Sequence, residues 1–268
     1  MIKIAIAGAA GRMGRTLTEA VAQHHQQMVV SAATVLKDDP ALGVDVATLI
    51  GATPCGIVTV PSLSETLGNF DILIDFTAPE ATIGHLAYCR ENSKAMVIGT
   101  TGFNQQQQSE IESISREIPM VFAPNMSIGV NLCFKLLQVA ATVLGDDVDI
   151  EIIEAHHRFK KDSPSGTALK MGEVIAEALD RDLKEVAVYG RERLGEERDR
   201  KTIGFATIRA GDIVGDHTVV FAGMGERLEI THRASSRMTF ASGAVRAAEW
   251  LENKPAGLYN MDDVLALN

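Results

Sequence analysis

Two histidines, one arginine and two lysines lie close together in one short stretch of the sequence. His156 and His157 are adjacent, and Arg158, Lys160 and Lys161 follow them. Imidazole groups titrate near neutral pH and act as general acids or bases, whereas guanidinium and ammonium groups attract carboxylates and phosphates. This cationic loop therefore predicts a binding site for a carboxylate or a phosphate, with a histidine as a proton donor.

A helix is expected to begin just after these residues and to contribute to the same site. Ser163 followed by Pro164 is typical of a helix N-cap and of the first helical residue. The small residues Ser165, Gly166 and Thr167 leave the N–H groups of the first turn uncovered, where the helix dipole favours an anion. The loop and the helix start together predict one anion-binding site.

Metal, thiol and serine chemistry are not predicted. Adjacent histidines on an extended segment point to opposite sides and no third ligand is evident, so we expect no metal. No serine lies in a GxSxG setting, so a hydrolase triad is not predicted. The cysteines are few and far apart and are interpreted as reduced thiols of the core: Cys55, Cys89 and Cys133. Three further histidines are interpreted as structural: His85, His217 and His232.

A glycine-rich turn near the start of the chain could hold a dinucleotide. Residues 8–14 read GAAGRMG, after a strand-like run and before a helical pattern. Gly8 permits a tight turn, Gly11 lets the backbone approach a pyrophosphate, and Gly14 allows close packing of helix on sheet. Because the spacing is GxxGxxG rather than GxGxxG, a glycine-rich turn without a ligand stays the alternative.

The preference between NADH and NADPH should depend on the residues after the second strand. A carboxylate there would accept from the ribose 2′-OH, and a basic residue would favour a 2′-phosphate. The run ATVLKDD at 33–39 has no carboxylate at the immediate strand end and offers Lys37. The sequence therefore favours NADPH, unless Lys37 is only a solvated loop charge.

The elements that must position these residues form two patterns. Short apolar runs alternate with helix-length segments up to about residue 125, which predicts a Rossmann-like, doubly wound parallel α/β sheet. The later pattern is α+β. We predict a dinucleotide-binding domain of residues 1–127 plus 237–268 and a substrate-binding and oligomerisation domain of 128–236. Predicted strands are 2–7, 28–35, 72–76, 95–98, 120–122, 148–154, 202–209, 217–222 and 227–232, and the later helices are 130–144, 165–179 and 239–251.

Composition excludes several classes of protein and partner. The chain has 268 residues, with 25 Lys and Arg against 35 Asp and Glu, which gives a formal net charge of −10. Such a charge disfavours binding to nucleic acid and to anionic membranes. The N-terminus lacks a signal-peptide pattern, and no uninterrupted apolar run of membrane-spanning length is present. We expect a cytoplasmic protein with no nucleic-acid or membrane partner.

Five motifs occur in order along the whole chain: GAAGRMG at 8–14, DFTAPEAT at 75–82, GTTGF at 99–103, APNMSIGVN at 123–131 and EAHHRFKKDSPSGTA at 154–168. In these motifs the chain resembles the 4-hydroxy-tetrahydrodipicolinate reductase family, also called dihydrodipicolinate reductase. The resemblance implies NADH- or NADPH-dependent reduction of hydroxy-tetrahydrodipicolinate to tetrahydrodipicolinate, with loss of water, on the diaminopimelate route to lysine. It also implies a homotetramer formed through the sheets of the second domain.

The family's residue roles carry over to matching positions. His156 resembles the acid/base residue and Lys160 the proton donor. His157, Gly166 and Thr167 resemble residues that bind the substrate carboxylates. Those expected to hold the cofactor are Gly8, Ala9, Ala10, Gly11, Arg12 and Met13 at the pyrophosphate, and Gly99, Thr100, Thr101, Ala123, Pro124, Asn125 and Met126 at the nicotinamide and its ribose.

Two positions depart from the family pattern. Many relatives carry an acidic residue at the position of Val35 and an arginine at that of Ala78. Nucleotide preference therefore does not follow from the resemblance. A dinucleotide-binding sensor without turnover and a dehydrogenase of another small carboxylate are the alternative functions. The sensor would predict loss of the proton donor or of the anion-binding helix start, and the sequence contains both.

Overall fold

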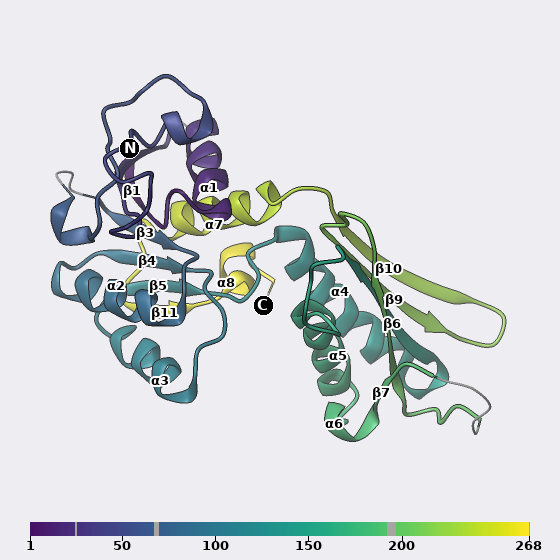
Figure 1. Cartoon of the computed structure of the whole chain (residues 1–268). Coiled ribbons are helices and arrows are strands. Elements are labelled where there is room, and N and C mark those ends of the chain that lie inside the picture. Colours follow the sequence, from purple (N-terminus) through teal and green to yellow (C-terminus); the bar gives the residue numbers. More distant parts are fainter. Residues whose placement is uncertain (25, 67–69, 192–196, 268) are drawn as a thin grey trace. The chain divides into compact units, whose positions relative to one another are not determined.

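The computed structural model describes residues 1–24, 26–66, 70–191 and 197–267 (Figure 1). It divides into two compact units. Unit 1 comprises Met1–Ile128 and Arg237–Asn268, and unit 2 comprises Gly129–Ser236.

Unit 1 contains a six-stranded parallel sheet with the strand order β11-β5-β4-β3-β1-β2. All residues of β3, the run ILID, are buried. Such near-continuous burial is expected of a parallel sheet that has helices on both faces. The strands are β1 (Ile2–Ala7), β2 (Met28–Ala33), β3 (Ile72–Asp75), β4 (Ala95–Ile98), β5 (Pro119–Phe122) and β11 (Gly257–Tyr259).

Helices cover the unit 1 sheet through two separate cores. Leu17 of α1 and Val245 of α7 belong to one buried cluster, whereas Leu86 of α2 and Ile111 of α3 belong to the other. This is the predicted doubly wound arrangement. The helices are α1 (Arg12–Gln23), α2 (Pro79–Glu91), α3 (Gln105–Ile114), α7 (Met238–Leu251) and α8 (Met261–Leu265), with short 3₁₀ helices at Thr48–Ile50 and Leu63–Glu65.

Unit 2 contains a mixed five-stranded sheet with the order β10-β9-β6-β8-β7. β6 runs parallel to β8 and antiparallel to β9. One sheet face packs against helices: Ile152 and Phe205 share a buried cluster with Leu137 of α4 and Ile175 of α5. The elements are α4 (Ile128–Leu144), a 3₁₀ helix (Gly145–Asp147), β6 (Asp149–His156), α5 (Gly166–Ala178), α6 (Leu183–Val186), β7 (Ala187–Tyr189), β8 (Ile203–Arg209), β9 (Gly215–Ala222) and β10 (Arg227–Ala234).

Two local predictions are wrong. Ser163 is not the N-cap and Pro164 is not the first helical residue, because Ser165 caps α5 by accepting a hydrogen bond from the N–H of Ala168 at 3.1 Å. Cys55 is exposed, whereas the other two cysteines are buried as expected. The carboxylate of Asp45 accepts the N–H of Cys55 and fixes this loop at the surface.

The long helix of unit 2 has the length and composition of a membrane span. The stretch Ile128–Asp147 reaches a mean hydropathy of 1.6. A core helix of a soluble protein passes the same test, and α4 buries Leu137 and Ala141 against the unit 2 sheet. One such helix is weak support for a span.

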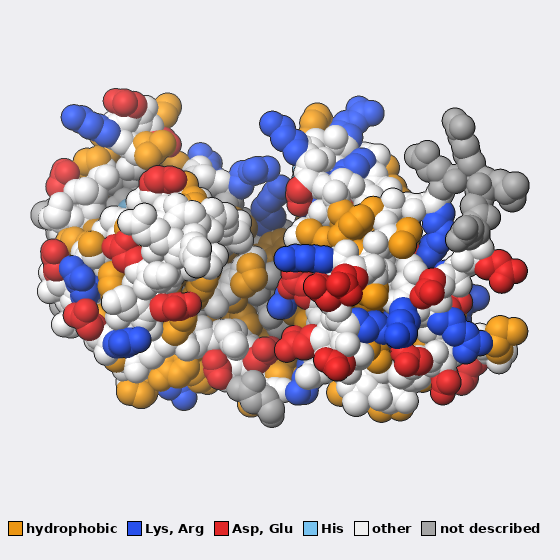
Figure 2. All heavy atoms as spheres, turned by 90° about the horizontal axis from the view of Figure 1, so that it is seen from below, with side chains coloured by type: hydrophobic (Ala, Val, Ile, Leu, Met, Phe, Trp, Pro, Cys, Tyr) orange, Lys and Arg blue, Asp and Glu red, His pale blue; other side chains and the backbone are white. Residues whose placement is uncertain are grey.

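The surface carries both signs of charge. Figure 2 shows acidic and basic side chains interspersed over the face in view.

Candidate active site

The loops after the parallel strands of unit 1 bring the predicted cofactor residues to one edge of the sheet. β1 lies between β2 and β3, so the strand order reverses there, and ligands of open α/β sheets bind beside such switch points. Arg12 and Met13 begin α1. The others follow strands that end at this edge: Gly8, Ala9, Ala10 and Gly11 after β1, Gly99, Thr100 and Thr101 after β4, and Ala123, Pro124, Asn125 and Met126 after β5.

The backbone of the glycine loop fits a pyrophosphate. Gly8 adopts a φ of 65°, a conformation that favours glycine. A Cβ on Gly14 would lie 2.2 Å from the carbonyl oxygen of Gly8, so only glycine allows α1 to approach the loop this closely. Gly11 is the N-cap and has no side chain to cover the first-turn N–H groups. The loop and the helix start can therefore donate these N–H groups to an anion.

Lys37 lies in the loop after β2 and is exposed. The N–H of Ala9 donates to the carbonyl of Thr34 at 2.8 Å, which ties the glycine loop to the end of β2. The loop that carries Lys37 therefore begins beside the glycine loop.

A buried carboxylate organises the same edge of the sheet. Asp75, the last residue of β3, is fully buried and accepts hydrogen bonds from the N–H and the hydroxyl of Thr77 and from Nδ1 of His85, at 2.9, 2.6 and 2.8 Å. The hydroxyl of Thr82 donates to that of Thr100 at 2.9 Å. Burial opposes ionisation, but the bonds from His85 and Thr77 outweigh it and lower the pKa of Asp75. Asp75 thus fixes the loop after β3 beside the predicted nicotinamide residues.

In unit 2 the histidines lie where β6 ends. His156 is the last residue of the strand and is buried, and His157 follows it and is half-buried. The N–H of Lys160 donates to the carbonyl of His157 at 3.1 Å, which closes a turn. Nζ of Lys160 lies 2.9 Å from Oδ2 of Asp162, so its ammonium already has a counter-ion on the loop.

The start of α5 lies beside this strand end. The N–H of Ser165 donates to Oε1 of Glu154 at 3.0 Å, which ties the helix cap to β6. Gly166 and Thr167 are the first residues of the helix, and a Cβ on Gly166 would meet no atom within 4 Å. The structure therefore brings the first turn of α5 to the strand that carries His156, and it leaves space next to Gly166.

Glu154 connects the parts of this site. Its side chain is 1% exposed, and Oε2 lies 2.6 Å from Nδ1 of His156. Arg209 donates to both carboxylate oxygens at 2.8 and 2.7 Å. Burial raises the pKa of Glu154, but the bonds from Arg209 and His156 outweigh burial and lower it overall. For His156, burial lowers the pKa and exceeds the opposite effect of Glu154. The pair therefore consists of a carboxylate and a neutral imidazole near neutral pH.

His217 supports the helix cap from β9. Its Nε2 lies 2.8 Å from the hydroxyl oxygen of Ser165, and its ring stands edge-on to that of His156 with 5.0 Å between centroids. Burial lowers the pKa of His217 to about 4. It is thus a neutral residue that holds the cap, in agreement with its structural interpretation.

Family comparison covers both units. The family described as dihydrodipicolinate reductase, N-terminus, matches residues 2–126, and that described as dihydrodipicolinate reductase, C-terminus, matches residues 129–265. The chain belongs to the dihydrodipicolinate reductase family. It is an oxidoreductase that uses a nicotinamide dinucleotide to reduce hydroxy-tetrahydrodipicolinate, a small dicarboxylate, in lysine biosynthesis by the diaminopimelate route. The sequence-based prediction of this family and function is confirmed.

Solved structures agree with this assignment. The dipicolinate-bound dihydrodipicolinate reductase from Paenisporosarcina sp. TG-14 is 26% identical over 97% of each chain, with a TM-score of 0.77. The amine dehydrogenase from Mycobacterium smegmatis (10% identity over 97% of this chain and 95% of that one, TM-score 0.60) shares the fold. So does a probable dehydrogenase from Thermotoga maritima, at 11% identity over 99% of this chain and 93% of that one, with a TM-score of 0.61.

Several residues that shape the reductase site were not predicted. Glu154 and His156 are two apart on β6, and alternation along a strand places both on one sheet face, so this spacing could have indicated the pair. Arg209 and Asp75 come from other elements and gave no local signal. Among the described residues, no group of three or more His, Cys, Asp and Glu side chains could hold a metal ion.

Proposed function

We propose that the reductase binds its dicarboxylate substrate at the end of β6 and the start of α5, with His156 and Lys160 as its proton-transfer residues and NADPH as the preferred cofactor. The observation that carries this proposal is the junction of Glu154, His156 and the Ser165 cap. There a buried carboxylate holds the imidazole beside the first turn of α5.

The chemistry of this junction supports the proposal that unit 2 binds an anion. The N–H groups of Gly166 and Thr167 lie at the positive end of α5, next to the open space beside Gly166. His157 follows His156 at the strand end and can donate to a second carboxylate. The solved relative from Paenisporosarcina binds dipicolinate, a dicarboxylate of matching chemistry.

The reaction consumes one hydride and one proton and releases one water. A bound nicotinamide supplies the hydride. Loss of the hydroxyl group as water leaves a conjugated imine, and an ammonium group can protonate the carbon that gains negative charge when the hydride adds to that imine. Lys160 is suited to this step because Asp162 holds its Nζ at 2.9 Å. Neutral His156 can accept or return a proton through Nε2.

Cofactor selection depends on the end of β2. Val35 places no carboxylate there to oppose a 2′-phosphate, and exposed Lys37 follows in the same loop. The preference for NADPH rests on these two positions.

We also propose that the reductase is a cytoplasmic homotetramer that forms through the unit 2 sheet. The sheet face opposite the helices exposes Ile153 and Ile208, at 38% and 49%. Apolar side chains on an open sheet face favour association with a second copy. Light scattering should therefore give the mass of four chains, and a monomer mass would reject this part of the proposal.

Kinetics with freshly generated hydroxy-tetrahydrodipicolinate test the assignment of roles. We expect His156→Gln and Lys160→Ala to lower kcat by about 10²–10⁴-fold. Lys170→Ala is a matched control, because Lys170 is an exposed lysine of the same unit that lies outside the loop and pairs with Glu173 on α5. Full turnover by His156→Gln and Lys160→Ala would reject the catalytic roles, although family membership would stand.

A further inference from the structure

We propose that Glu154 is a positioning residue that keeps the proton of neutral His156 on Nδ1 and leaves Nε2 to exchange a proton with the substrate. This inference rests on the proposed catalytic role of His156. It adds a residue that acts through His156 and through the start of α5.

Hydrogen bonding fixes which imidazole nitrogen carries the proton. Oε2 of Glu154 lies 2.6 Å from Nδ1 of His156 and also accepts from Nη1 of Arg209 at 2.8 Å. An ionised carboxylate only accepts hydrogen bonds, so Nδ1 must donate. Neutral His156 therefore carries its proton on Nδ1 and presents a lone pair at Nε2.

The surroundings of the pair keep Glu154 ionised. Arg209 donates to both oxygens, and the N–H of Ser165 donates to Oε1 at 3.0 Å, so the carboxylate has four donors. Its side chain is only 1% exposed, which makes each of these bonds costly to lose. The charged or titratable groups that face His156 are Glu154 on the same strand, Lys160 on the following loop, Arg209 on β8 and His217 on β9.

One carboxylate thus positions two parts of the site. Through Oε2 it orients His156, and through Oε1 it holds the Ser165 cap, which directly precedes Gly166 and Thr167. The same buried side chain therefore fixes the position of Nε2 of His156 relative to the N–H groups of Gly166 and Thr167. A packing role alone would not require an ionised group at this position.

Substitution by glutamine has a defined consequence here. Both oxygens of Glu154 face an N–H group of Arg209, so an amide nitrogen must lose an Arg209 bond in either orientation. An amide nitrogen in place of Oε1 would also lose the Ser165 bond. An amide nitrogen in place of Oε2 would instead be able to donate to Nδ1 of His156. That orientation retains more bonds, and it moves the imidazole proton to Nε2.

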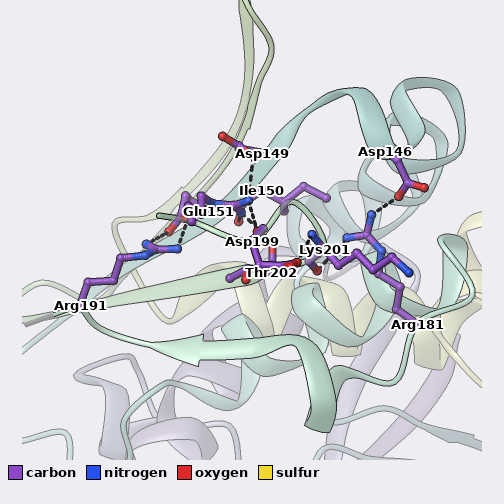
Figure 3. A network of polar contacts seen from close by, with 10 residues as sticks. Asp146, Asp149, Ile150, Glu151, Arg181, Arg191, Asp199, Lys201 and Thr202 are labelled. Carbon is purple, nitrogen blue, oxygen red and sulfur yellow. Dashed lines mark hydrogen bonds and ion pairs between the residues drawn. The ribbon is translucent and has the colours of Figure 1, made fainter. Parts of the chain in front are cut away.

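The matched control is Glu151 on the same strand. Glu151 lies three residues before Glu154, on the opposite sheet face. Arg191 donates to both carboxylate oxygens of Glu151, at 3.0 and 2.8 Å (Figure 3). Arg198 also donates to Oε1. Glu151→Gln therefore removes a similar arginine-bound carboxylate from β6 without contact with His156.

Nitrogen-15 NMR of the imidazole groups tests the proposal directly. The signals of His156 are assigned by their absence in His156→Gln, and the spectrum of the unsubstituted reductase at pH 7.5 should show Nδ1 protonated. We expect Glu154→Gln to show Nε2 protonated and Glu151→Gln to match the unsubstituted protein. An Nε2-protonated His156 in the unsubstituted reductase would overturn the proposal, even if Glu154→Gln failed to fold.

Steady-state kinetics provide the second arm. Glu154→Gln should lower kcat on the order of 10²–10⁴-fold, as expected when the wrong tautomer is presented. The limb of the pH profile that belongs to His156 should move to lower pH, because an ionised neighbour is lost. Turnover and a pH profile equal to those of Glu151→Gln would overturn the proposal. Unchanged turnover in His156→Gln would instead reject the catalytic role of His156, while the tautomer would still be read from the spectrum.

Discussion

Acid should lower the free energy of unfolding of unit 2 through His217, because the folded protein holds this histidine neutral. Its side chain lies between β9 and the α5 cap, with Nε2 2.8 Å from the hydroxyl oxygen of Ser165. Within the described part of the chain, its buried Nδ1 has no hydrogen-bond partner. A second proton would make this buried ring a cation with no water to solvate it, so burial lowers the pKa of His217 from 6.5 to about 4.

The size and sign of the effect follow from this difference. The unfolded chain binds the proton near pH 6.5 and the folded chain only near pH 4. The contribution of His217 to the free energy of unfolding is therefore complete above pH 6.5. It falls as the pH drops below 6.5 and is lost below about pH 4. A difference of about 2.5 pKa units at about 1.4 kcal/mol each gives a loss of roughly 3.5 kcal/mol. By pH 5 the loss should be about 2 kcal/mol.

Urea unfolding of the reductase and of His217→Gln isolates this contribution. Glutamine can still reach the Ser165 hydroxyl but does not titrate. Between pH 7 and pH 5, we expect the free energy of unfolding of the unsubstituted protein to fall by about 2 kcal/mol more than that of the variant. An NMR titration of the C2 proton of His217 should show the low pKa. A normal pKa, or equal pH dependence in both proteins, would refute the reasoning.

Two further predictions concern the cofactor edge of unit 1. Gly14→Ala should lower stability by about 1–3 kcal/mol and raise the KM for the dinucleotide, because its Cβ would lie 2.2 Å from the Gly8 oxygen. Gly84→Ala on α2 is the control, since a Cβ there meets nothing within 4 Å, and it should be neutral or slightly stabilising by calorimetry. Lys37→Ala should raise the KM for NADPH more than that for NADH, and equal changes would remove Lys37 from cofactor selection.

Sequence patterns predicted the elements of the fold where burial is continuous or periodic. The run ILID predicted β3 correctly, because a strand that is buried on both faces of a parallel sheet is largely apolar. Three-residue strands such as β7 and β11 are too short to show a period and were not predicted. Their formation depends on tertiary pairing with β8 and β5.

The candidate site could be predicted only where its residues are close in sequence. The run from His156 to Thr167 predicted a substrate-binding loop, which stays a proposal, but the prediction of a cap at Ser163 is wrong because Ser-Pro matches only a general helix signal. Hydrogen bonds to Glu154 and Ala168 select Ser165 instead. Arg209 comes from β8, so its contact with Glu154 exists only once the strands have paired.

The most direct test of the central claim follows hydride transfer in the unsubstituted reductase and in His156→Gln. NADPH deuterated at the transferred position of C4 is mixed with hydroxy-tetrahydrodipicolinate, and the product is analysed by mass spectrometry over time. We predict a product one mass unit heavier with the unsubstituted reductase, formed about 10²-fold or more slowly by His156→Gln. An unlabelled product, or equal rates for the two proteins, would contradict the account.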